Sequence, residues 1–371
     1  MPVFVNDDYL LFEAVKWGKR DKVRGLLSSG CHRNLRDDAG RTAVHWAAER
    51  DYLDVLYLLI DENWDLNTAD AKQQTPLLIA CNYRRENVAS CLITMGCDVN
   101  AADIAGNTPL HRAVRMDIET IAAMLCKFGA EVDSKNGAWW TPLHEAARTG
   151  NERIVKMLLQ RNADVNAVTK KGSTPFLTSI FYYKIAQKNT YTNLDNILKM
   201  FVDSRCRLSQ SDGQWTPLSA SISTDNSFIA ALLIYSGCMF EKRNKYSRSL
   251  LVEAFTRCEP FVSRLMVMAG YQVNQEEVDM CSRRIPSFSR TFMRLVEPNT
   301  DISSGRYDLL NWLREHARTP KSLSELSRAS IRHSLNLGAD DTSILDSIYQ
   351  LPLPECLKNF LAMSDFISGI L

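Results

Sequence analysis

Three histidines are the residues in this sequence whose type and spacing come nearest to catalytic or metal-binding chemistry. His45, His111 and His144 lie in the similar stretches TAVHWAA, TPLHRAV and TPLHEAA. An imidazole can act as a general base or bind zinc, and HEAAR at His144 begins like the zinc-protease motif H-E-x-x-H. Arg148, however, stands where the second histidine must be to bind the metal from the next helical turn. The sequence therefore predicts no zinc site, and the recurrence of these histidines in one pattern favours a structural role.

Other catalytic and cofactor motifs are also missing from the sequence. It contains no glycine-rich phosphate loop, no nucleophile elbow and no set of kinase motifs. Lys and Arg number 44 against 43 Asp and Glu, and a formal net charge of +1 does not favour nucleic acid or an anionic membrane as the main partner. We therefore expect no enzyme activity, no cofactor, and protein partners only.

The cysteines and the apolar runs indicate the compartment. Ten cysteines are scattered along the chain without a C-x-x-C pair, mostly within apolar runs, as is typical of buried thiols in a reducing compartment. The first ten residues, MPVFVNDDYL, lack the basic and apolar regions of a secretory signal. The longest uncharged apolar run, 228–240, is shorter than the roughly 20 residues that span a bilayer. We expect the protein in the cytoplasm, with the nucleus left open as a second compartment.

The elements that position the histidines recur along the chain at a fixed period. Five similar stretches begin at threonines that each lie 33 residues after the last: Thr42, Thr75, Thr108, Thr141 and Thr174. Threonine followed by proline predicts a helix start, and in each unit a second apolar helical pattern follows, as in 154–167. A period of this length predicts stacked helix pairs.

The period and the T-P-L-H motif resemble the ankyrin repeat. The resemblance implies an all-α ankyrin-repeat solenoid of about eight repeats over residues 5–275, with the best repeats in 37–168. It also implies that the motif histidine braces a turn by hydrogen bonding. Thr216, the next threonine of the series, follows Thr174 by 42 residues, which predicts an insertion between the two helices of the repeat at 169–211. Residues 276–318 are then expected to form a helical linker or cap.

Repeat stacks present a concave surface, made of turn tips and first-helix faces, on which a target could bind. Exposed aromatic residues are good anchors for a partner. The alternative is that single tryptophans fold down on neighbouring turns, and for any one of them we leave both interpretations open. The candidate target-binding residues are Arg50, Tyr83, Met116, Trp139, Trp140, Arg148, Tyr182 and Trp215.

The pattern changes near the C-terminus. Ser322 and Glu325 have the spacing of a capping box, which predicts that a new helix starts at Leu323. Further along, Pro352 and Pro354 hold residues 351–354 extended, immediately before a second apolar helical pattern. A segment of about 40 residues with short helices buries too little surface to be stable by itself, so it needs either the last repeat or another protein.

These two stretches resemble the two parts of a SOCS box, here residues 319–363. The first, 322–335, is similar to an Elongin-binding box, and the second, 348–361, to a Cullin-5 box. Together with the repeats they resemble the ankyrin repeat and SOCS box family. The resemblance implies Elongin C contacts at Ser322, Leu323, Leu326, Ser327 and Ile331, and Cullin contacts at Leu351, Pro352, Leu353 and Pro354. Ser327 departs from the family pattern, in which cysteine is commoner.

The family resemblance implies a non-catalytic substrate-recognition subunit of an Elongin B/C, Cullin-5 and RING ubiquitin ligase, in which the repeats hold the target. The alternative is an ankyrin scaffold or inhibitor protein whose C-terminal helices only cap the repeats. The sequence does not indicate which protein is the target.

Three asparagines share one position of the repeat: Asn67, Asn100 and Asn166. Ankyrin proteins that resemble this one can be hydroxylated there. The alternative is that these residues simply brace the turn.

Overall fold

The computed structural model describes residues 4–30, 35–186, 194–235, 238, 240, 249–258 and 260–284. Within these ranges the chain forms seventeen helices and no strand, which confirms the all-α class. The helices divide between two compact units, the first with α1 to α10 and the second with α11 to α17. The Elongin-binding box, the Cullin-5 box and most of the predicted linker at 276–318 lie outside the described residues.

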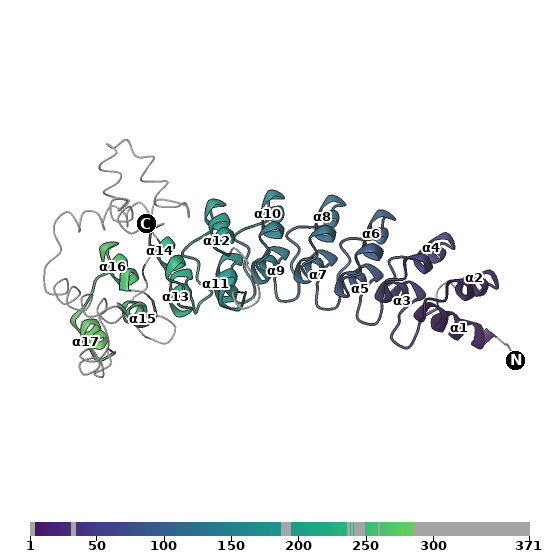
Figure 1. The fold of residues 1–371 in the computed structure, drawn as a ribbon, viewed down its shortest axis with the longest axis horizontal. Helices are drawn as coiled ribbons and strands as arrows, with labels where there is room; N and C mark the ends of the chain where they lie inside the picture. The colour runs from purple at the N-terminus through teal and green to yellow at the C-terminus, as the bar shows by residue number, and fades with distance from the viewer. Residues whose placement is uncertain are drawn as a thin grey trace, which may run out of the picture. The chain divides into compact units, whose positions relative to one another are not determined.

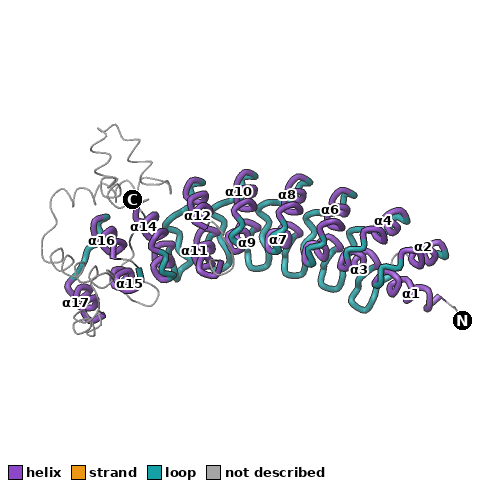
Figure 2. Tube along the Cα trace, in the orientation of Figure 1, coloured by secondary structure: helices purple, strands orange, loops and turns teal. Residues whose placement is uncertain are grey.

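The first unit is a stack of five helix pairs (Figures 1 and 2). In Figure 1 the odd-numbered helices form one row, the even-numbered helices a second row, and the loops that enter the odd-numbered helices lie on the other side of the first row. The helices are α1 (Phe4–Lys16), α2 (Arg20–Ser28), α3 (Ala43–Arg50), α4 (Leu53–Asp61), α5 (Pro76–Asn82), α6 (Glu86–Thr94), α7 (Pro109–Arg115), α8 (Glu119–Lys127), α9 (Pro142–Thr149) and α10 (Glu152–Gln160).

The second unit repeats the pattern with three more pairs and a final helix. Its helices are α11 (Pro175–Ala186), α12 (Leu194–Asp203), α13 (Pro217–Ser223), α14 (Ser227–Tyr235), α15 (Leu250–Arg257), α16 (Pro260–Met268) and α17 (Gln275–Arg284). Helix α11 has 12 residues, whereas α5 has 7 and α9 has 8, so the chain is longer in the repeat where the sequence predicts an insertion.

The first helices from α3 to α13 begin after the threonine of the motif, because the side chains there satisfy free backbone groups. Thr108 lies in extended backbone at the N-cap, its side chain accepts from the backbone of His111, and Pro109 starts the helix. The N–H of a proline is not needed at that position, and a threonine oxygen replaces one missing intrahelical bond. The same capping box occurs at Thr42 and Thr141.

The first helices contribute to the core the leucine and alanine side chains that follow the capping threonine. Leu77, Leu110 and Leu143 are buried, as are Ala80, Ala113 and Ala146, which recur at the same spacing. Alanine allows neighbouring first helices to approach closely, and each buried leucine contributes roughly 1.5 to 3 kcal/mol of burial free energy. The repeat pattern read from the sequence is therefore the pattern of the core.

Candidate target-binding surface

The loops that precede the first helices form a row of hairpins, which we call the fingers: 37–41, 70–74, 103–107, 136–140 and 169–173. In the third finger the Asp103 carboxylate accepts hydrogen bonds from the N–H groups of Ala105 (2.9 Å) and Asn107 (2.9 Å). Asp37, Asp70 and Asn136 close their fingers in the same way. A short polar side chain that accepts from the backbone two residues on is typical of a tight turn.

Backbone hydrogen bonds join each finger to the next. Ala71 donates to Ala39, Ile104 to Lys72, Gly137 to Ala105 and Lys170 to Ala138, at 2.7 to 3.1 Å. The tips in the first unit therefore form a continuous ladder, so side chains on neighbouring tips are held at fixed positions relative to one another.

The motif histidines connect one repeat to the next and are not exposed for catalysis. His45 Nδ1 accepts from the N–H of Thr42 (3.0 Å), and Nε2 lies 3.0 Å from the carbonyl oxygen of Gln74 in the next finger. His111 makes the same bonds to Thr108 and to the carbonyl of Trp140. Because Nδ1 accepts and Nε2 faces a carbonyl, both rings are neutral with the hydrogen on Nε2. Burial lowers the pKa of His45 and of His111, more than the facing carbonyls raise it. This is the turn-bracing role that the resemblance implies.

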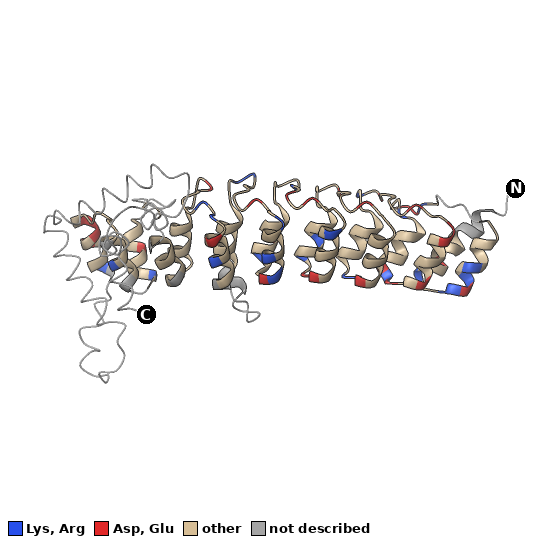
Figure 3. Ribbon diagram, turned by 90° about the horizontal axis from the view of Figure 1, so that it is seen from above, with Lys and Arg blue, Asp and Glu red and all other residues tan. Residues whose placement is uncertain are grey.

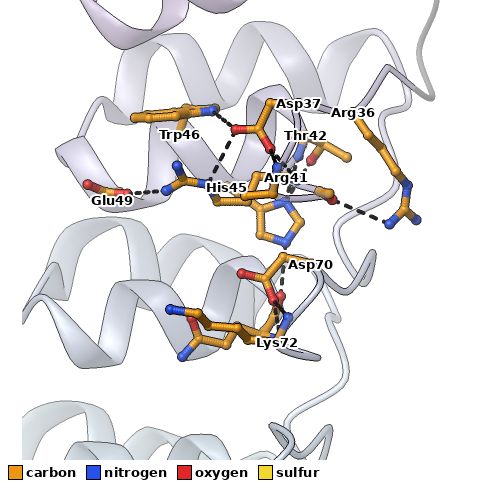
Figure 4. A network of polar contacts seen from close by, with 12 residues as sticks. Arg36, Asp37, Arg41, Thr42, His45, Trp46, Glu49, Asp70 and Lys72 are labelled. Carbon is orange, nitrogen blue, oxygen red and sulfur yellow. Dashed lines mark hydrogen bonds and ion pairs between the residues drawn. The ribbon is translucent and has the colours of Figure 1, made fainter.

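At the first finger, the groups that could hold a target are already occupied (Figure 4). The Arg41 guanidinium stacks on Trp46, with 4.0 Å between its central carbon and the ring centroid, and pairs with Glu49 at 2.9 Å. The Trp46 Nε1 hydrogen bonds to Asp37 at 3.0 Å. This network satisfies its own charges, so it rigidifies the finger and leaves little free charge for a partner.

The three predicted finger tryptophans differ in how far their rings are exposed to solvent. Trp139 is 49% exposed, whereas Trp140 and Trp215 are half-buried. The Trp140 ring lies 5.8 Å from His144, and the Trp215 ring packs edge-on against Phe181 at 5.9 Å. Trp140 and Trp215 therefore each lie against another ring, and Trp139 presents its ring to solvent.

The exposed apolar residues that the sequence prediction did not name include Ile104 and Trp17. Ile104, at the tip of the third finger, is 79% exposed, and Trp17, at the end of α1, is 64% exposed. Trp17 lies 33 residues before Arg50, so counting back one repeat would have found it. Ile104 stands at a turn position where polar residues are usual, which was the available signal.

The predicted target-binding residues on the first helices also differ in solvent exposure. Arg50 and Tyr83 are exposed at the ends of α3 and α5, with Tyr83 at 51%, and Met116 is half-buried at the end of α7. Arg148 lies one residue before the position that these three share, and its Nε donates to Glu145 at 2.9 Å. Tyr182 is half-buried in α11.

The carboxylates of Asp70 and Asp103 are turned inward in their fingers. Asp103 is 6% exposed and forms an ion pair with Arg112. Burial by itself would raise the pKa of the Asp103 carboxyl, but the hydrogen bonds from Arg112 and the Asn107 backbone outweigh it and hold the pKa below its usual value. Over the first unit as a whole, basic and acidic residues are interspersed (Figure 3).

The asparagines of the hydroxylation prediction lie in the turns after the second helices. Asn67 accepts from the N–H of Asp98 (2.7 Å), and Asn100 accepts from Glu131 (2.8 Å) and donates to Gly129 (3.1 Å). The N–H of Asn166 donates to Asp164 at 2.9 Å. Hydroxylation stays a prediction, and a mass increase after coexpression with an asparaginyl hydroxylase would test it.

The described residues also bear on metal binding and on insertion into a membrane. They contain no group of three or more His, Cys, Asp or Glu arranged to hold a metal ion. None of their helices is both long and apolar enough to cross a membrane.

Comparison with known proteins gives matches at both ends of the chain. The family model "Ankyrin repeats (3 copies)" matches residues 11–103, 65–136 and 99–169, and the model "SOCS box" matches residues 319–362. Ankyrin repeat domain-containing protein 63 of Homo sapiens is 43% identical over 58 residues, and Rabankyrin-5 of Mus musculus is 34% identical over 81 residues. These matches cover 16% and 22% of this chain, and only 15% and 7% of those relatives.

Helix pairs, fingers and capping histidines together define an ankyrin-repeat protein. Because a SOCS box follows the repeats, the chain belongs to the ankyrin repeat and SOCS box proteins. Both kinds of domain bind other proteins and are not catalytic domains.

Proposed function

We propose that this protein is a substrate receptor of a Cullin-RING ubiquitin ligase, in which the ankyrin repeats bind the target and the SOCS box docks the ligase. The observation that carries the proposal is the order of the two matches, with a SOCS box at 319–362 behind the repeats. In finer detail, the box at 322–335 binds Elongin C with Elongin B, and the box at 348–361 selects Cullin-5 with its RING protein.

The residues proposed for docking suit their roles chemically. Leu323, Leu326 and Ile331 recur at helical spacing, and each would contribute about 1.5 to 3 kcal/mol when buried, before the costs of ordering and association. Pro352 and Pro354 pin the backbone of the second box before it meets its partner, which lowers the entropy lost on binding. Ser327 is small enough for a close contact but offers less apolar surface than cysteine, so we expect it to weaken Elongin binding.

On this proposal the chain performs no chemistry. It raises the effective concentration of target lysines near a ubiquitin-loaded E2, which accelerates transfer by proximity. We propose the cytoplasm as the site of action, because the scattered cysteines suit a reducing compartment.

Copurification with purified partners tests the docking role. The full chain is mixed with Elongins B and C, then with Cullin-5 and its RING protein, and analysed by size exclusion. We expect a complex with wild type, loss of the Elongins with Leu323→Pro, and loss of Cullin-5 with retention of the Elongins when Leu351→Ala and Pro352→Ala are combined. Asp340→Pro, which places a proline between the boxes, is the matched control and should leave both interactions intact.

A wild-type chain that stays by itself in this experiment contradicts the proposal. It would then be an ankyrin scaffold or inhibitor protein whose C-terminal helices cap the repeats. In that case residues 336–346 should also resist proteolysis in the isolated chain, because a packed cap protects its backbone.

A further inference from the structure

Trp139 occupies a backbone position that suits glycine. Its φ of 62° lies in the left-handed region, where the equivalent residues of three other fingers are Gly40, Gly106 and Gly172, with φ of 75° to 82°, and that of the fourth is Gln73, with φ of 57°. A bulky side chain is disfavoured in this conformation because its Cβ crowds the following carbonyl. Folding stability by itself therefore favours glycine over tryptophan at residue 139.

The ring at this position is exposed and held in place. It is 49% exposed at the fingertip, and the Lys135 ammonium lies 5.7 Å from its centroid. A cation over one face attracts the ring electrostatically and restricts its rotation. A pre-ordered aromatic loses little entropy when a partner covers its other face.

The neighbouring fingertips add apolar surface and positive charge. Ile104 precedes Trp139 by one finger and is 79% exposed. Lys72 and Lys170 are exposed, and the backbone ladder fixes their fingers beside those of Ile104 and Ala138. Residues 71–73, 104–106 and 137–139 include one lysine and no carboxylate.

The acids of the same fingers do not offset this charge at the surface. Asp70 and Asp103 are each 6% exposed, and both are used to close their turns. Asp103 is paired with Arg112 as well. The outward face of these fingers therefore combines large apolar side chains with lysines.

We propose that fingers 70–74, 103–107 and 136–140, with the adjoining Lys135 and Lys170, bind an acidic linear segment of the target that carries an aromatic or aliphatic side chain. The apolar side chain packs on Trp139 and Ile104, and the carboxylates pair with Lys135, Lys72 and Lys170. This inference rests on the proposed role of the repeats as the target-binding part. It goes beyond that role because it names the chemistry of the segment and separates Trp139 from Trp140.

Selection from a peptide library tests the proposal. A phage-displayed library of random twelve-residue peptides is panned on the immobilised full chain, and the enriched peptides are sequenced. We expect peptides with net negative charge and at least one large apolar residue close to Asp or Glu. Binding of the best peptide, synthesised with a fluorescent label, should weaken as salt is raised because the lysine contacts are screened.

Substitutions in the fingers test whether the selected peptide binds at this surface. Trp139→Gly and Lys135→Glu should each raise the Kd of the labelled peptide by about tenfold or more, as loss of an interface anchor does. Trp139→Gly should leave the Tm unchanged or raise it, because glycine relieves the left-handed strain. Phe128→Ser and Lys127→Glu, which make similar changes at the end of α8 in the row of even-numbered helices, should leave the Kd unchanged.

Three results would overturn the proposal: no enriched peptide, enriched peptides without acidic residues, or a Kd that is indifferent to Trp139→Gly and Lys135→Glu. Copurification of the same variants with Elongins B and C keeps this question separate from the docking role. If the chain binds the peptide but not the Elongins, the proposed peptide-binding surface is supported and the receptor role is contradicted. If it binds the Elongins but no peptide, the receptor role is supported and the peptide-binding surface is contradicted.

Discussion

At the scale of single residues, the histidine of the motif acts as a neutral hydrogen-bonding link between repeats. His111 accepts from Thr108 and faces the carbonyl of Trp140, the residue beside the exposed Trp139. Protonation would remove the acceptor and charge a buried ring, which is why burial lowers the pKa. In the preceding repeat Leu78 occupies the same position, so the fold tolerates a residue without this link.

The lowered histidine pKa values predict that acid destabilises the repeats. The unfolded chain titrates its histidines near 6.5 and the folded chain at lower pH, so below about 6.5 the unfolded state binds more protons. The histidines should therefore contribute their full stabilisation above pH 6.5. The free energy of unfolding should fall as the pH drops below 6.5 and through the folded-state pKa values.

His111→Leu separates this effect from general acid denaturation. At pH 7.5 it should cost about 1 to 3 kcal/mol, because the backbone of Thr108 and Trp140 loses its partner. The difference from wild type, measured by urea unfolding, should shrink toward pH 5, whereas the control Thr108→Ser keeps the cap hydroxyl and the pH dependence. A difference that stays constant between pH 7.5 and 5 would contradict the assigned protonation state.

At the scale of elements, the fingers are built by close backbone approach as well as by turn chemistry. A Cβ added at Gly106 would lie 2.8 Å from the backbone nitrogen of Gly137 in the next finger, at a φ of 77°. Gly129 has a similarly positive φ of 91°, yet an added Cβ there would meet nothing within 4 Å. These two glycines separate the cost of the left-handed conformation from the cost of forcing fingers apart.

We predict that Gly129→Ala costs about 1 to 2 kcal/mol, the penalty of the left-handed region, and that Gly106→Ala costs clearly more. Gly106→Ala should also weaken binding of the selected acidic peptide, because it displaces the tip that carries Ile104. Urea unfolding and peptide titration measure the two effects. Equal unfolding costs for both variants would mean that the backbone ladder between fingers contributes little to stability.

At the scale of the whole molecule, the described helices form two compact units, and buried thiols report on each of them. Burial is the largest effect that raises the pKa of Cys81 and Cys97 in the first unit, and of Cys258 in the second, each to about 12. Thiols of this kind react only when the surrounding structure opens, since the thiolate is the nucleophile.

Pulsed alkylation with mass spectrometry in increasing urea should label Cys258 before Cys81 and Cys97. Repeat arrays are stabilised by contacts between neighbouring repeats. The first compact unit contains such contacts in the hydrogen bonds from His45 and His111 to the next finger, and we expect it to open later. A control at pH 8 without urea should show none of the three thiols modified. Labelling of all three at one urea concentration would show that the units unfold together.

The sequence by itself determined the all-α class, the repeat, the helix starts at T-P and the SOCS box. The first three features depend on a residue's own turn or on the next repeat, so the 33-residue period reveals them, whereas the SOCS box follows from its own two motifs. A structural role of the histidines also followed from their shared position, and the ankyrin resemblance implied that they brace a turn. The predicted contacts of the SOCS box stay predictions, since they lie outside the described residues.

Only the tertiary structure decided which side chains of the fingers reach solvent. Trp139 and Trp140 are neighbours in sequence, but Trp140 lies against His144 while Trp139 takes the left-handed position of a glycine and projects from the tip. The tertiary structure also shows that Ile104 and Trp17 are exposed. Exposure depends on what the adjoining loop and helix place over a ring, and that packing is not encoded in the spacing of the motif.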